Sequence, residues 1–225
     1  MSICTSSDAY DSINDFKNNL KEVDILMSYS RVNKKSLDKY KLFNKMAIVL
    51  LCCHFESFIE AFISEHVDML KACYNSGNIP QYMKDNYVND AFETLKNRSK
   101  PSSDKKTLNA LFKLHDSAIV DMSNLNDLKL DMKYSFGKHG QEETEKIFNK
   151  FGLNSFVASV EFKTSFKVIN SAISIRNNII HEGSAPTLSY EDLSRYVSNF
   201  LKFADGLYNH IMKNQKQYYG KIIYK

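Results

Sequence analysis

The sequence predicts an all-α fold, and three observations lead to this expectation. Glycine and proline are scarce, with seven and three among 225 residues, where average usage would give roughly 16 and 11. Apolar residues recur every three or four positions over long stretches, which is the period of an amphipathic helix. No stretch shows the coherent alternation of apolar and polar residues that is typical of a half-buried strand. We therefore expect a few long helices joined by few turns.

The first third of the chain predicts two helices. The first covers about residues 7–29, and its apolar residues form one stripe. A polar break at residues 31–35 follows, after which Ser36 can cap a second helix over about residues 37–74. The stretch 46–55 is apolar all round, so this part of the second helix should be buried. The stripe of the first helix consists of Ile13, Phe16, Leu20, Val23 and Met27.

Two more long helices are predicted near the C-terminus. A helix over about residues 155–182 should end at Gly183, which is followed by Pro186. The last helix should begin at Ser189, because Asp192 stands three residues further on and completes a capping box. Its apolar residues, spaced four and three apart, are Leu193, Val197, Phe200, Ala204, Leu207 and Ile211.

The region between these helix pairs, about residues 79–153, is less regular. We interpret it as a helical insert on the same scaffold, so residues 1–225 form a single domain. Short helices are expected there over about residues 82–95, 104–115 and 142–151.

Composition narrows the function classes. The net charge is +4 and the pI is about 8.7, which permits nucleic-acid binding without requiring it. Lysines gather at residues 34–45, a pattern most often found on a solvated helix face. The four cysteines lack zinc-ligand spacing, and the longest uncharged apolar stretch, 46–55, is about half a membrane span. We expect a cytoplasmic protein with free thiols that uses no metal or cofactor and no membrane partner.

The predicted helix over residues 155–182 holds one charge in an apolar setting. Between Val168 and His181, Arg176 is the only formally charged side chain. An unpaired buried charge is costly, so Arg176 must pair, reach solvent or face another surface. Arg176 can have a structural role, in which it reaches solvent or pairs with a core carboxylate. A functional role is the alternative.

His181 follows Arg176 by five residues, which places it about 140° further around the helix. The segment 176–181 reads Arg-Asn-Asn-Ile-Ile-His. It resembles the R-x4-H signature of the HEPN superfamily, including the polar residue after the arginine. The stretch 46–62 is similar to the helix of MAE-type HEPN-like nucleases, where an apolar run leads into an aromatic-Glu pair, here Phe55-Glu56. The resemblance covers about residues 42–211. It departs from the family pattern at Glu182, where glycine is frequent.

The resemblance implies an up-and-down helical bundle that forms a two-fold dimer with one composite cleft. It implies a metal-independent endoribonuclease, acting as a toxin or anti-phage defence effector, with RNA as substrate and an antitoxin or defence protein as partner. Arg176 and His181 would be its catalytic residues, supported by Asn177 and Glu56.

The chemistry is consistent with these residue types. Cleavage of RNA without a metal needs a base for the 2′-OH proton, an acid for the 5′-oxygen and a cation for the phosphorane. Histidine is the natural acid or base near neutral pH, and arginine binds phosphate oxygens as a fork. One Arg176 and one His181 are half of such a site, and a two-fold axis beside them supplies the other half.

Alternatives stay open for the supporting residues and for the function. Asn177 can bond His181 or phosphate, or be an ordinary surface residue. Glu56, with Glu60 one turn away, can orient Arg176 or pair with lysine on the surface. The alternative function is a non-catalytic helical module that binds RNA or protein. Four other histidines have no obvious partner in the sequence: His66, His115, His139 and His210.

Overall fold

The computed structural model describes residues 10–73, 80, 82, 140–182 and 187–220. These residues form helices and no strand. The helices are α1 (Asp11–Val32), α2 (Leu37–Cys73), α6 (Gln141–Lys150), α7 (Asn154–Val157), α8 (Val160–Glu182), α9 (Tyr190–Lys213) and α10 (Gln215–Tyr219). The all-α prediction is therefore confirmed. The short helices expected over 82–95 and 104–115 lie outside the described residues.

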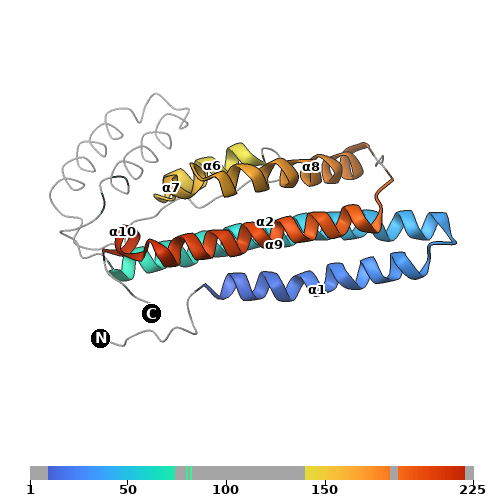
Figure 1. The fold of residues 1–225 in the computed structure, drawn as a ribbon, viewed down its shortest axis with the longest axis horizontal. Helices are drawn as coiled ribbons and strands as arrows, with labels where there is room; N and C mark the ends of the chain where they lie inside the picture. The colour runs from blue at the N-terminus through green and yellow to red at the C-terminus, as the bar shows by residue number, and fades with distance from the viewer. Residues whose placement is uncertain (1–9, 74–79, 81, 83–139, 183–186, 221–225) are drawn as a thin grey trace, which may run out of the picture.

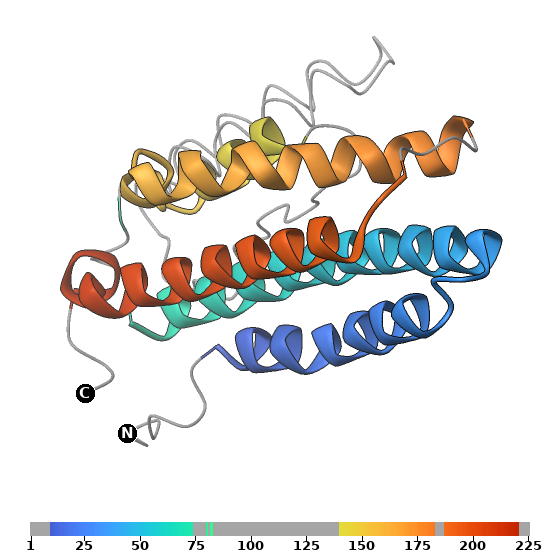
Figure 2. The same cartoon turned by 45° about the vertical axis from the view of Figure 1, so that its right-hand side comes forward.

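Four long helices run up and down along one axis (Figure 1). Helices α2 and α9 form the centre of the bundle, α1 packs on one side of this pair and α8 on the other (Figure 2). The chain turns from α1 into α2 at the same end of the bundle at which α8 leads into α9. Residues at both of these turns therefore share one end, which we call the turn end.

Aromatic rings fill the core between these helices. Phe203 of α9 is fully buried, and five phenylalanine rings surround it with centroids 5.2–6.3 Å away. Burying such large side chains supplies much of the stabilisation of a bundle of this size. The five rings belong to Phe55, Phe148, Phe156, Phe162 and Phe166.

The helix expected over 155–182 is in fact two helices, α7 and α8. The break falls at Ser159, whose hydroxyl accepts the backbone N–H of Phe162 at 3.1 Å. Ser159 thus acts as the N-cap of α8, because a serine oxygen satisfies an N–H that has no partner in the first turn. The predicted capping box of Ser189 and Asp192 is confirmed at the start of α9.

Two further expectations need correction. Helix α1 extends to Val32, three residues beyond the predicted end, and Asn33 ends it with backbone and side-chain bonds to the Tyr29 carbonyl. The apolar run around Val168 to Ile180 would leave this helix no solvated face there, but Thr164, Lys167, Ser171 and Ser174 form an exposed polar strip along α8.

Helix α2 is unusually long and apolar. By length and composition its segment Leu37–Leu70 would suffice to cross a membrane, yet half of the most apolar stretch is buried inside the bundle. A core helix surrounded by other helices has the same property, since apolar residues on most sides then contact neighbours.

Candidate active site

The last two turns of α8 carry the R-x4-H segment. In the same helix, Ile169, Ala172 and Ile173 are buried, and Ile175 and Ile179 pack against the core from half-buried positions. This apolar anchoring fixes the helix against α2 and α9. The side chains on the other faces of this helix, including that of Arg176, therefore have defined directions.

Arg176 is half-buried and poorly satisfied. Its Nη1 donates a hydrogen bond to Oδ1 of Asn177 at 2.9 Å. Its Nε is buried and has no hydrogen-bond partner. Among the described residues, no carboxylate forms an ion pair with this guanidinium. The Arg176 charge is therefore partly shielded from solvent, and within the described ranges its hydrogen-bond partner is one neutral amide.

The guanidinium acts on α2 at Cys52. Burial raises the pKa of the Cys52 thiol, and the positive charge of Arg176 opposes that shift, while Cys53 and Glu56 add to it. Arg176 and Glu56 thus both act electrostatically at the same point of α2. No ion pair joins Glu56 to Arg176 or to a lysine among the described contacts.

Glu56 also acts on its neighbour one turn away. Partial burial raises the pKa of Glu60, and the charge of Glu56 raises it further. Two carboxylates that repel each other along one helix face form a site that attracts cations.

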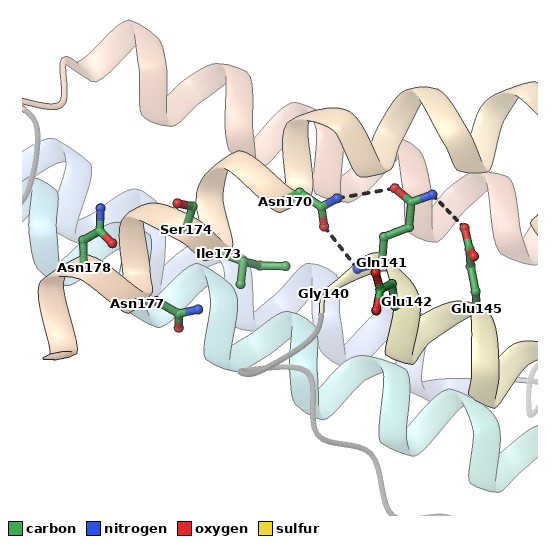
Figure 3. Close-up of a pocket in the computed structure, with 9 residues that line it drawn as sticks. All are labelled: Gly140, Gln141, Glu142, Glu145, Asn170, Ile173, Ser174, Asn177 and Asn178. Atoms are coloured by element: carbon green, nitrogen blue, oxygen red, sulfur yellow. Dashed lines mark hydrogen bonds between the residues drawn. The ribbon is translucent and has the colours of Figure 1, made fainter.

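Asn177 makes a contact that the sequence did not predict. Its Oδ1 accepts a hydrogen bond from Nη1 of Arg176 at 2.9 Å, and no hydrogen bond to His181 is found among the described residues. In Figure 3 its side chain points away from the helix axis beside Ile173. The sequence could not show this contact, because adjacent residues on a helix usually face different directions.

His181 stands in the last turn of α8 and is exposed. No hydrogen bond joins it to Arg176 in the described part of the chain. Both residues lie on α8, where a spacing of five residues corresponds to a rotation of about 140°. The side chains of Arg176 and His181 therefore leave the helix on different faces.

A cleft of about 620 Å³ opens beside Asn177. It lies between the start of α6 and the outer side of α8 (Figure 3). Asn170 accepts the backbone N–H of Gln141 at 3.1 Å, and the Gln141 side chain donates to Glu145 at 2.7 Å. This cleft could not be predicted from the sequence, because its two walls are about 30 residues apart in the chain. Its lining residues are Gly140, Gln141, Glu142, Glu145, Asn170, Ile173, Ser174, Asn177 and Asn178.

Comparison with known families identifies the chain. Residues 6–213 match the model of the RiboL-PSP-HEPN family. The chain belongs to this HEPN family. No curated protein and no solved structure matches it. Membership of a HEPN family is consistent with RNase activity in general, and the all-α bundle agrees with it.

Two histidines of this HEPN chain that had no obvious partner in the sequence are structural. His66 is fully buried; its Nε2 donates to the Phe151 carbonyl at 3.1 Å, and its Nδ1 bonds the hydroxyls of Tyr10 and Tyr219 at 3.0 and 2.9 Å. Burial lowers the pKa of His66 to about 4. The ring is therefore neutral at physiological pH, and it joins both ends of the described chain to α2.

His210 belongs to a second polar cluster in this HEPN bundle. Its Nε2 lies 3.0 Å from both Ser155 Oγ and the Tyr218 hydroxyl, which are themselves 2.6 Å apart. Partial burial lowers the pKa of His210. Residues far apart in the sequence form both clusters, so spacing could not predict them. His139 lies outside the described residues, as does His115.

The positions of possible metal-ligand side chains can be compared with those of a metal site. In the ranges that the structure describes, no three His, Cys, Asp or Glu side chains come together as a metal site would require.

Proposed function

We propose that this HEPN chain is an endoribonuclease whose active site is built from Arg176 and His181 of two copies. The observation that carries the proposal is the Arg176 guanidinium, half-buried with an unpartnered Nε and no carboxylate. A charge kept in such a position costs stability, and costly features of this kind concentrate at functional sites. A phosphate group would supply the missing anionic partner.

The proposed reaction is transfer of the phosphoryl group to the neighbouring 2′ oxygen. One His181 takes the proton of the 2′-OH, and this oxygen attacks phosphorus. The bond from phosphorus to the 5′-oxygen breaks, and the second His181 protonates the leaving oxygen. Arg176 stabilises the charge on the phosphorane, with Asn177 holding its guanidinium in place. The products are a 2′,3′-cyclic phosphate and a 5′-hydroxyl.

The two half-sites require a second copy, and the turn end offers a surface for it. Large apolar side chains are uncovered there, with Ile180 49% exposed, Leu42 54% and Met46 46%. An isologous contact at this end would duplicate Arg176 and His181 about one axis. In this proposed dimer the contact is made by the C-terminal end of α8, and the exposed polar strip of α8 stays outside the interface.

The biological role that we propose is that of a toxin or an anti-phage defence effector in the cytoplasm, held in check by an antitoxin or another defence protein. Such enzymes need a controlled partner because unrestrained RNA cleavage harms the cell. This setting rests on the family resemblance.

The experiment that tests the proposed reaction is cleavage of end-labelled single-stranded RNA in the presence of EDTA. We expect activity to persist and the products to carry 2′,3′-cyclic or 3′-phosphate ends, because the 2′-OH is the nucleophile. A strict requirement for added magnesium together with 5′-phosphate products would contradict the mechanism. Absence of cleavage by a folded dimer would favour the non-catalytic RNA-binding or protein-interaction module.

A further inference from the structure

The positive charge of the chain is concentrated at the turn end. Five basic residues and one acidic residue, Asp38, give residues 31–41 a formal charge of +4. This equals the net charge of the whole 225-residue chain, so the remainder is formally neutral. The five cations, which we call the basic tip, are Arg31, Lys34, Lys35, Lys39 and Lys41.

The basic tip is available to a partner. All five side chains are exposed, and none forms an ion pair with another described residue. Clustered cations without counter-charges repel one another and raise the local concentration of anions. Exposed lysines of this kind are free to bind phosphates, and the release of counterions favours such binding.

Aromatic rings accompany the cations. Tyr29 is 56% exposed and stacks on Phe43 with ring centroids 5.7 Å apart and planes inclined by 26°. Arg31 lies over the ring of Tyr190 at 5.8 Å. Bases of single-stranded nucleic acid stack on exposed aromatic and guanidinium planes, whereas the paired bases of a duplex are not accessible to them.

The basic tip shares the turn end with His181. Asn44 of α2 donates from Nδ2 to the Leu188 carbonyl at 2.7 Å, which ties the start of α2 to the segment just before α9. Figures 1 and 2 both place the α1–α2 turn and the end of α8 at this end of the bundle. A strand bound along the tip would therefore lie at the same end of the bundle as the proposed active site.

We propose that the basic tip is a docking surface for single-stranded RNA, binding phosphates through its cations and a base on the Tyr29–Phe43 pair. The proposal rests on the endoribonuclease function and names where its substrate binds outside the catalytic residues. Two tips of the same charge repel each other, so in the dimer proposed at this end of the bundle the contact is made by Ile180, Leu42 and Met46, and the tip cations stay available to an anion. Charge and stacking chemistry together fit a single RNA strand.

The test measures binding of a fluorescein-labelled 2′-O-methyl oligouridylate, which has no free 2′-OH and cannot be cleaved. The test variant is the triple Lys34→Gln, Lys35→Gln, Lys39→Gln. The matched control is Lys202→Gln, Lys213→Gln, Lys216→Gln, which removes three exposed lysines from α9 and α10. Each lost contact with a single strand should lower the salt slope by about 0.7, which is about fivefold in affinity at about 0.1 M salt.

We therefore expect the tip triple to bind about 10- to 100-fold more weakly, with a salt slope reduced by about 2, and the control triple to bind nearly as wild type. Tyr29→Ala should weaken binding about fivefold or more, whereas Tyr29→Phe, which keeps the ring, should not. Every substituted side chain is exposed, so all variants should fold, and melting curves check this.

Equal loss in both triples would overturn the proposal, because binding would then follow overall charge. Unchanged binding in the tip triple would also overturn it. Loss of binding to phosphatidylserine vesicles with unchanged RNA binding would assign the tip to a membrane surface instead. These outcomes are distinguishable from those for catalysis. If the tip triple loses RNA binding but the wild type cleaves no RNA, only the endoribonuclease proposal is refuted. If the wild type cleaves RNA and the tip triple binds RNA normally, only the docking surface is refuted.

Discussion

Replacing Arg176 by methionine should abolish RNA cleavage without lowering the stability of the fold. A buried N–H without a partner costs about 1–3 kcal/mol, and the Nε of Arg176 is such a group. Methionine keeps most of the aliphatic packing of the arginine stem while it removes the charge and the unsatisfied donor. We expect the free energy of unfolding to stay the same or to rise by about 1 kcal/mol. Loss of a transition-state donor should lower the cleavage rate about 10²–10³-fold.

The assay combines urea unfolding with single-turnover cleavage of the same RNA. Arg195→Met is the matched control, because Arg195 is an exposed arginine of α9 that pairs with Asp192 in the first turn. This control should cleave RNA at the wild-type rate. A loss of stability of more than about 2 kcal/mol in Arg176→Met, with cleavage retained, would show that Arg176 is a structural charge.

Three further predictions concern the fold and the assembly. His66→Gln should flatten the dependence of stability on pH between about 6.5 and 4. The pKa of His66 in the folded protein is lowered to about 4, so the unfolded chain binds one more proton in this window, and wild-type stability decreases by up to about 3 kcal/mol as the pH is lowered. Equal slopes in urea titrations of the two proteins would contradict this. Ser189→Ala should cost about 1 kcal/mol in thermal unfolding, because it removes the hydroxyl that accepts the Asp192 backbone N–H; an unchanged melting temperature would refute the role of the cap. Sedimentation should show a dimer, and Ile180→Lys should dissociate it; a stable wild-type monomer at micromolar concentration would rule out the composite site.

Most of the fold was predictable because each long helix has its own apolar stripe. The period of Ile13, Phe16 and Leu20 predicts a helix without reference to the rest of the chain, and these residues are buried as expected. Boundaries set by single polar contacts were harder. The break at Ser159 depends on one side-chain bond to Phe162, and a serine in an otherwise helical pattern does not reveal which way its hydroxyl turns.

The candidate site was predictable only in part. The sequence points to Arg176 as a charge on an apolar helix, and the structure places it half-buried with an unpartnered Nε. The contact between the neighbours Arg176 and Asn177 depends on their rotamers, and the effect on Cys52 depends on how α8 lies against α2; no local pattern encodes either. The cluster around His66 needs residues from opposite ends of the chain, and the cluster around His210 needs Ser155, which lies 55 residues away.

The central claim is that His181 performs acid and base chemistry in a composite site with Arg176. The most direct measurement is the single-turnover cleavage rate of His181→Ala, alongside its RNA affinity and its sedimentation. His54→Ala is the matched control, because His54 is a histidine of α2 that bonds Glu22. The account predicts that His181→Ala loses about 10²–10⁴ in rate while affinity and dimer stay intact, since losing a positioned acid or base has an effect of this size. Cleavage at the wild-type rate by folded His181→Ala protein would contradict the account and leave the chain as a non-catalytic RNA-binding or protein-interaction module.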